Sequence, residues 1–226
     1  MQYELREQVA VLNLDDGKVN AVGHAFLDFV NEGLDRAQAD KAGAVMLCGR
    51  EGLFSAGFDL KEFEKGAENG VSMVARGMEL AIRLYGFPMP VVAACTGHAI
   101  AMGAFILLAC DTRVGARGEF RFTLPETRIN MEIPRVVQAL CVARLAPTIM
   151  TQAVIQSRIF NPADAVAAGF LDEIVAAEDV EATAFAAARE LGELPQAFYA
   201  ANKMFMREDT LREMRAQFDK ALASAR

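Results

Sequence analysis

Two glycine-flanked segments could do chemistry with the backbone itself. Phe54 to Leu60 (FSAGFDL) follows the apolar run AVMLC, and Gly97 to Gly103 (GHAIAMG) follows the run VVAAC. Small residues let the backbone approach a ligand closely. N–H groups from two neighbouring turns can then point at one oxygen, and a helix N-terminus adds positive potential there. This is the arrangement of an oxyanion hole. From spacing alone, tight structural turns remain the simpler explanation.

Other catalytic signatures are missing from the sequence. The segment from Gly52 to Gly57 has the glycine spacing of a P-loop, but Phe58 and Asp59 stand where Lys and Ser/Thr are required. There is no GxGxxG fingerprint and no GxSxG elbow. The two histidines, His24 and His98, are interpreted as a surface residue and a structural residue. No spacing of His, Cys or Asp indicates a metal site, and no metal is expected.

Three motifs follow one another along the chain: FSAGFDLKEF (54–63), PVVAACTGHAIAMGAFILLACD (90–111) and FTLPETRINMEIP (122–134). In order and spacing they resemble the central motifs of the crotonase superfamily, also called the enoyl-CoA hydratase/isomerase superfamily. The resemblance runs from about residue 5 to 176 and includes RIFNPADAVAAGFLDEIV. It implies an α/β fold with a ββα spiral core and an enzyme that stabilises the enolate of an acyl-CoA thioester. Coenzyme A is then part of the substrate, and no separate cofactor is expected.

The resemblance assigns roles to residues around the two turns. It implies that the Phe58 and Met102 N–H groups form the oxyanion hole. The family usually has glycine where Met102 stands, so we expect this side chain to crowd the site. Ala56 and Gly57 are expected along the path of CoA. Lys203 is either a phosphate contact or, more simply, a solvated surface lysine.

The choice of reaction depends on the carboxylates. Hydratases of this family use two glutamates, and the sequence keeps only the second, Glu126; Phe105 occupies the position of the first. A phenyl ring cannot hold or deliver a water proton, so syn hydration should be impaired. The Leu-Pro-Glu-Thr turn around Glu126 resembles that of Δ3,Δ2-enoyl-CoA isomerases, where one base moves a proton from C2 to C4. Glu132 is a competing carboxylate. Asp59 is expected to cap its loop beside the substrate.

Other functions stay open on the sequence alone. The same enolate-stabilising site could instead carry out hydration, decarboxylation or thioester hydrolysis. A non-catalytic acyl-CoA-binding protein is also compatible with the missing first glutamate and the bulky Met102. The length and branching of the acyl chain cannot be read from the sequence.

The elements that must position these residues alternate between strand and helix. We expect a strand over 3–14, a helix from Asn20, and buried strands at 44–48 and 91–95. Residues 49–60 should form a loop, 67–86 a helix, and AFILLAC a fully buried helix or strand. Short strands are expected within 111–125, a loop over 126–134, and a final strand at 171–175. Asn161, Pro162 and Gly169 mark the cap, first turn and end of a helix.

Two domain regions are expected: a crotonase-like spiral core over 1–176 and a helical region over 177–226 of the type that forms trimers. The 226 residues are 53% hydrophobic and 23% charged, as in an ordinary globular protein, and carry a net charge of −7. This argues against a nucleic-acid binder. The four cysteines should be buried and reduced. With neither a signal peptide nor a membrane span in the pattern, we expect a cytoplasmic homotrimer or hexamer that acts on an acyl-CoA thioester.

Overall fold

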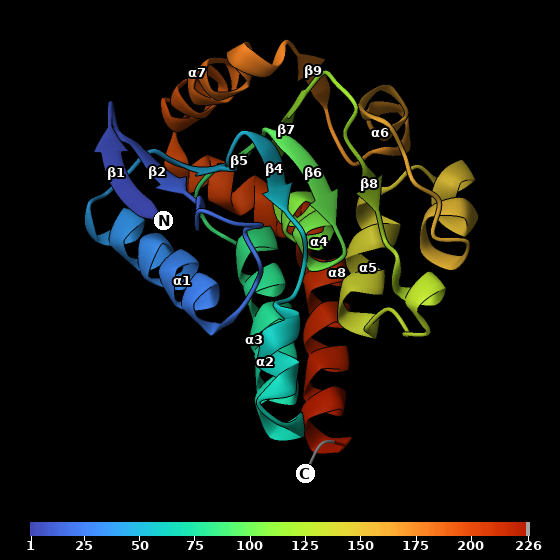
Figure 1. The fold of residues 1–226 in the computed structure, drawn as a ribbon. Coiled ribbons are helices and arrows are strands. Elements are labelled where there is room, and N and C mark those ends of the chain that lie inside the picture. Colours follow the sequence, from blue (N-terminus) through green and yellow to red (C-terminus); the bar gives the residue numbers. More distant parts are fainter. Residues whose placement is uncertain (225–226) are drawn as a thin grey trace.

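A computed structural model describes residues 1–224, which form two sheets surrounded by helices (Figure 1). The larger sheet has six strands in the order β1-β2-β3-β5-β7-β9, and the smaller has three in the order β4-β6-β8. All neighbouring strands pair in parallel except β1 and β2. The strands are β1 (Gln2–Arg6), β2 (Val9–Asn13), β3 (Ala44–Cys48), β4 (Gly52–Ser55), β5 (Val91–Cys95), β6 (Gly97–Ile100), β7 (Thr112–Ala116), β8 (Phe122–Thr123) and β9 (Glu173–Val175).

The helices lie on both faces of the larger sheet. They are α1 (His24–Ala39), α2 (Leu60–Glu64), α3 (Ala67–Tyr85), α4 (Met102–Ala109), α5 (Arg135–Arg144), α6 (Pro162–Ala168), α7 (Val180–Gly192) and α8 (Gln196–Ser224), with short turns η1 (Glu126–Ile129), η2 (Pro147–Ile149), η3 (Thr151–Ile155) and η4 (Ala177–Asp179). Alternate residues of β3 face opposite layers: Val45 and Leu47 join the main core, whereas Met46 packs in the layer beneath α7. Burial on both faces explains why these strands are apolar throughout.

The chain repeats one unit three times. A strand of the larger sheet is followed by a short strand of the smaller sheet and then by a helical segment: β3-β4-α2/α3, β5-β6-α4 and β7-β8-η1/α5. This is the ββα spiral expected from the sequence, with a helical C-terminal part. Each repeat turns from the second strand into the helix at the same end of the smaller sheet, because β4, β6 and β8 are parallel.

Two local expectations were wrong. The strand expected over 3–14 is a hairpin, because Glu7 and Gln8 adopt positive φ angles of 46° and 63° between β1 and β2. The glycine-flanked segments also contain strands, since β4 pairs with β6. This pairing requires Gly97, where a Cβ would lie 1.9 Å from the carbonyl carbon of Gly52.

The C-terminal helices pack on different parts of the core. Helix α7 covers the larger sheet through Val180, Ala184 and Ala188. Helix α8 runs beside α3 and α5 (Figure 1). Both expectations for Lys203 were wrong: its side chain is only 5% exposed, and its Nζ pairs with Asp111 at 2.7 Å. Arg207 pairs with the same carboxylate at 2.8 Å. These cations therefore hold α8 against the end of α4.

Several smaller expectations were confirmed. Asn161 accepts a hydrogen bond from the N–H of Asp164, Pro162 begins α6, and Gly169 ends it in a left-handed conformation. Helix α4 is buried along its whole length. The four cysteines are free and buried. Among residues 1–224, no helix is both long and apolar enough to cross a membrane.

Candidate active site

The first turn, Ala56 to Asp59, leaves β4 in a shape that depends on Gly57. Gly57 has φ +94°, its N–H donates to Ser55 Oγ (3.2 Å), and its carbonyl accepts from the N–H of Val22 (2.8 Å). The N–H of Asp59 donates to the Val22 carbonyl at 3.3 Å. Phe58 stands between these anchored residues, and its N–H makes no hydrogen bond within residues 1–224. The turn therefore leaves this donor available.

The second turn joins β6 to α4 through a strained residue. Ala101 has φ 50° and ψ −123°, a conformation that L-residues rarely adopt. Met102 is the first residue of α4, and no hydrogen-bond acceptor for its N–H occurs in the described part of the chain. Strain of this kind concentrates at functional sites, where the surrounding structure holds it in place. Here it presents a free N–H at the start of a buried helix.

The two turns are packed directly against each other. A Cβ on Gly57 would lie 2.9 Å from Ala101 Cβ, 3.0 Å from the Ile100 carbonyl oxygen and 3.4 Å from the Met102 nitrogen. The structure thus brings the segments of Phe58 and Met102 together, as an oxyanion hole requires. Gly57 is necessary for this approach because a larger residue would separate the turns.

The side chain of Met102 does not occupy an open site. It is 1% exposed and joins the main core, where its Cε lies 3.5 Å from the Cβ position of Gly77 in α3. The ring of Phe58 lies on the same glycine, with Cζ 2.6 Å from that position. Gly77 therefore makes room for both side chains. The Met102 side chain therefore packs towards α3, and the crowding that we expected from it is relieved.

Glu126 follows β8 and begins the short turn η1. Its side chain is buried (6% exposed), its Oε2 makes no hydrogen bond, and it forms no ion pair within residues 1–224. Burial raises the pKa of this carboxyl group above its usual value. Burial also raises the pKa of the Cys141 thiol, with a smaller contribution from the charge of Glu126, which places this cysteine of α5 nearby.

Strand pairing connects Glu126 with the oxyanion turns. Ile100 of β6 pairs with Thr123 of β8, and the Ala101 N–H donates to the Thr123 carbonyl at 3.1 Å. Met102 and Glu126 follow these paired positions by two and three residues. The free N–H and the buried carboxylate therefore emerge at the same edge of the smaller sheet.

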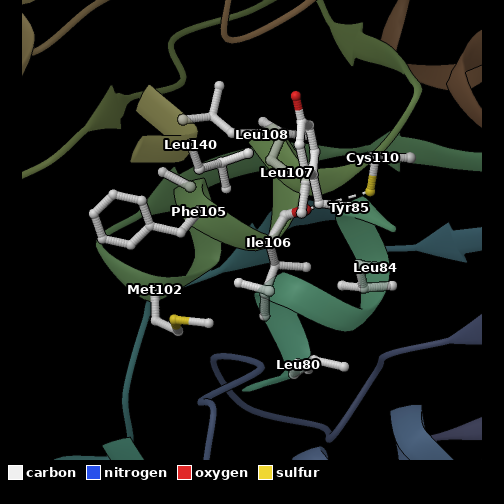
Figure 2. Packing of buried hydrophobic residues seen from close by; sticks show 14 of the residues in the cluster. Leu80, Leu84, Tyr85, Met102, Phe105, Ile106, Leu107, Leu108, Cys110 and Leu140 are labelled. Carbon is white, nitrogen blue, oxygen red and sulfur yellow. Dashed lines mark hydrogen bonds between the residues drawn. The ribbon is translucent and has the colours of Figure 1, made fainter. Parts of the chain in front are cut away.

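Phe105 lies one turn into α4 and is 2% exposed. Figure 2 shows its ring leaving α4 on the side away from Leu80 and Leu84 of α3, while Met102 leaves in a different direction. Helix α4 (MGAFILLA) carries no carboxylate. The interior that Phe105 fills is therefore apolar, without a second acid from this helix.

The remaining candidate residues either have local hydrogen-bond partners or are exposed. Asp59 caps α2, since its Oδ1 accepts from the N–H of Lys61 (3.0 Å), as the sequence indicated. The N–H of Ala56 donates to the Val19 carbonyl (3.1 Å). Glu132 is exposed, unlike Glu126. His98 has a structural partner: its Nδ1 accepts from the N–H of Arg121 (3.0 Å).

Three supporting residues were not anticipated from the sequence. Ser55 donates from Oγ to the Asn20 carbonyl (2.7 Å), and Asn20 is fully buried and donates to the Phe54 carbonyl (3.1 Å). Together they hold the first turn. Gly77, in the interior of α3, receives Phe58 and Met102. A glycine inside a helical pattern is a readable indication of such a close approach.

Two free backbone donors and a buried carboxylate, all following the same edge of the smaller sheet, can together stabilise an oxyanion and move a proton. An enzyme that forms an enolate needs both of these groups. Comparison with known proteins agrees with this class. The sequence model for enoyl-CoA hydratase/isomerase matches residues 4–223. The chain therefore belongs to the enoyl-CoA hydratase/isomerase family, within the crotonase superfamily, and is an enzyme of that family.

Solved structures and curated proteins resemble the chain, and some are named isomerases whereas others are named hydratases. An apo enoyl-CoA isomerase of Mycobacterium tuberculosis superposes with a TM-score of 0.94 and 41% identity, over 98% of this chain and 97% of the other. The human mitochondrial Δ3,Δ2-enoyl-CoA isomerase superposes with a TM-score of 0.92 and 27% identity, over 99% and 89%. A probable enoyl-CoA hydratase of Bacillus subtilis is 34% identical over 127 residues, which is 54% of this chain and 48% of the relative.

Proposed function

We propose that the protein is a Δ3,Δ2-enoyl-CoA isomerase with Glu126 as its single acid–base group. The thioester oxygen accepts hydrogen bonds from the N–H groups of Phe58 and Met102, which stabilise the dienolate. Glu126 removes a proton from C2 of the 3-enoyl-CoA and returns it to C4. The product is the conjugated 2-enoyl-CoA, and no water is consumed.

One observation carries this proposal: the site has one buried, unpaired carboxylate, and Phe105 fills the helix position from which hydratases supply a second. A raised pKa makes Glu126 a stronger base than an exposed glutamate, which suits a group that takes a proton and returns it. The phenyl ring of Phe105 has no polar atom that could bind a hydrating water. Both features favour transfer of a proton within the substrate over addition of water.

Hydration of 2-enoyl-CoA is the second candidate, because several relatives carry hydratase names. The probable enoyl-CoA hydratase of Bacillus subtilis is one, and a Mycobacterium marinum structure titled enoyl-CoA hydratase is 40% identical with a TM-score of 0.94. The relatives' names therefore support the family's chemistry without separating the two reactions. Phe105 is the residue that favours isomerisation.

Parallel assays of the wild-type enzyme separate the two candidates. Purified protein is given 3-enoyl-CoA in one cuvette and crotonyl-CoA in the other, and the ultraviolet absorbance of the conjugated thioester is followed. The proposal predicts a rise with 3-enoyl-CoA and a kcat/KM for hydration at least 10²-fold lower, the scale of one lost acid–base group. Rapid loss of absorbance from crotonyl-CoA would contradict it.

We also propose a homotrimer or a hexamer made of two trimers in the cytoplasm. Large apolar side chains at the start of α8 support the assembly, since Phe198, Phe205 and Met206 are all more than 70% exposed. Contiguous apolar surface of this kind marks interaction sites. Light scattering on the purified protein tests the assembly; a monomer at micromolar concentration would contradict it.

A further inference from the structure

The N–H of Phe58 belongs to a peptide unit whose carbonyl group is anchored on the opposite side. This unit joins Gly57 to Phe58, and the peptide bonds of residues 1–224 are all trans, so its N–H and its C=O point in opposite directions. The Gly57 carbonyl accepts a hydrogen bond from the N–H of Val22 at 2.8 Å. The Val22 contact therefore fixes the plane of the peptide, and with it the direction of the Phe58 N–H.

The second donor is oriented by its own helix. The Met102 N–H shares a peptide unit with the Ala101 carbonyl, which accepts from the N–H groups of Ala104 (2.9 Å) and Phe105 (3.1 Å). Both of these residues belong to α4, so the orientation of the Met102 N–H is set within a few residues. Phe58 lies before α2 rather than inside it. The orientation of the first donor therefore depends on a contact that is distant in sequence.

Asn20 couples the segment of Val22 to the end of β4, immediately before the first turn. Asn20 is fully buried and has φ 47°, a left-handed conformation that asparagine tolerates better than most residues. Its Nδ2 donates to the Phe54 carbonyl at 3.1 Å. Ser55 Oγ donates to the Asn20 carbonyl (2.7 Å) and accepts from the N–H of Gly57 (3.2 Å). The buried asparagine thus contacts the turn through both its side chain and its backbone.

Asp16 closes the loop between β2 and α1 onto Asn20. Its Oδ1 accepts from the N–H groups of Asn20 (3.0 Å) and Lys18 (2.7 Å), and its own N–H donates to Asn20 Oδ1 (3.1 Å). Partial burial raises the pKa of Asp16, but hydrogen bonds from backbone N–H groups outweigh this effect and hold the pKa below its usual value. The two reciprocal hydrogen bonds between Asp16 and Asn20 form what we call the Asp16–Asn20 clasp.

We infer that the Asp16–Asn20 clasp positions the first oxyanion donor, so that Asp16 and Asn20 are positioning residues for the reaction. The clasp holds the segment of Val22, and Val22 in turn holds the peptide unit of Phe58. The inference rests on the proposed function for the thioester oxygen that this N–H meets. Rotation of the peptide would lengthen that hydrogen bond, and a misplacement of about 1 Å caused by a distant residue can reduce a rate about 10²-fold.

Four variants test the clasp. Asp16→Ala removes its acceptor at an exposed position, and Asp16→Asn keeps an oxygen that can accept from the same N–H groups. Asn20→Gly removes the other side chain without straining the backbone, because glycine adopts a positive φ freely. Asp15→Ala is the matched control. Asp15 is also exposed in this loop, but its Oδ1 accepts from the N–H of Gly17 (2.8 Å) rather than from Asn20.

Steady-state isomerisation separates positioning from binding. The hydrogen bond to the thioester oxygen strengthens as that oxygen gains charge, so weakening it should lower kcat more than it raises KM. Asp16→Ala and Asn20→Gly should lower kcat by about 10- to 100-fold and change KM by less than about threefold. Asp16→Asn should recover most of the lost kcat, and Asp15→Ala should match wild type. A role in folding alone would lower the urea midpoint and leave kcat of the folded variants unchanged, which would overturn the inference.

The conjugated thioester 2,4-hexadienoyl-CoA reports the position of the donor without turnover, because isomerisation gives it no more stable product. Its ultraviolet absorption band moves to longer wavelength when hydrogen bonds polarise the thioester carbonyl. The band should shift on binding to wild type, Asp15→Ala and Asp16→Asn, and should shift less on binding to Asp16→Ala and Asn20→Gly. A full wild-type shift in both Asp16→Ala and Asn20→Gly would overturn the inference.

The outcomes separate the inference from the proposed function. A shift that is reduced in Asp16→Ala and restored in Asp16→Asn supports the clasp even if wild type isomerises no 3-enoyl-CoA. Isomerisation by wild type, with an unchanged shift and an unchanged kcat in Asp16→Ala and Asn20→Gly, supports the function and overturns the clasp. Binding of 2,4-hexadienoyl-CoA to wild type without any shift overturns both, because the two donors then form no oxyanion hole.

Discussion

Replacing Gly57 by alanine should separate the two turns of the oxyanion hole. The added Cβ would lie 2.9 Å from Ala101 Cβ and 3.0 Å from the Ile100 carbonyl oxygen. Neither atom can rotate away, because one is fixed to the backbone and the other belongs to it. The alanine must also adopt φ +94°, which L side chains disfavour.

The expected cost has two parts. The left-handed φ costs about 1–2 kcal/mol, and overpacking against fixed atoms costs about 1–3 kcal/mol. Alanine also restricts the unfolded chain, which offsets about 0.4–1 kcal/mol. The free energy of unfolding should therefore fall by about 2–4 kcal/mol. If the turns move apart so that one N–H no longer reaches the oxygen, kcat should fall by about 10²–10³.

Gly52→Ala is the matched control. Gly52 also has a positive φ, +75°, but nothing lies within 4 Å of its Cβ position. Gly52→Ala should lower the free energy of unfolding by about 1 kcal/mol, through its φ angle alone. Urea denaturation compares the three proteins, and with an m-value of about 2 kcal/mol per molar the two variants should differ by about 1 M in midpoint. Gly57→Ala that is as stable and as active as Gly52→Ala would refute the reasoning.

Three further changes test other parts of the structure. The raised pKa of Glu126 means that folding favours its protonated form, so this stability is present below the unfolded pKa of about 4.5 and is lost as pH rises through the folded pKa. Glu126→Gln should therefore gain stability relative to wild type as pH increases above about 4.5 in urea titrations; a difference that does not change with pH would contradict this. Asp111→Asn should lower the free energy of unfolding by about 3 kcal/mol, because it leaves Lys203 and Arg207 without a counter-charge; an unchanged melting temperature would argue against it. Ala101→Gly should stabilise the protein by about 1 kcal/mol by relieving its φ of 50°, and a destabilised variant would show that the strain is absent.

Local patterns in the sequence were sufficient to predict much of the framework. The cap at Asn161, the left-handed end at Gly169 and the buried helix α4 all follow from neighbouring residues. The runs AVMLC and VVAAC became strands buried on both faces. These features are local because propensity, capping and apolar runs act over a few residues.

Features that depend on distant contacts were missed. The strands β4 and β6 look like turns in isolation, because each is a short segment that is stabilised only by the other. Lys203 resembles a surface lysine in its helix until Asp111 is placed beside it, 92 residues away in sequence. The direction of Met102 depends on Gly77, which only the packing of α3 against α4 brings near. In each case the sequence shows the residue type, but it does not show which distant residue contacts it.

The residues of the proposed site were predictable from the sequence. The sequence motifs indicated Glu126, Phe58 and Met102, and the structure adds that the carboxylate is buried and unpaired. It also adds the strain at Ala101, which no local pattern indicates because alanine is ordinary at the start of a helix. This strain arises from tertiary packing, so it could not be read from the motifs.

The most direct test of the central claim is the rate of 3-enoyl-CoA isomerisation by Glu126→Gln, measured as the rise in ultraviolet absorbance. Glu132→Gln, which removes an exposed carboxylate from the same loop, is the control. The account predicts that kcat falls by about 10²–10⁴ in Glu126→Gln and stays within a few-fold of wild type in Glu132→Gln. An active Glu126→Gln enzyme that produces the conjugated thioester at the wild-type rate would contradict it.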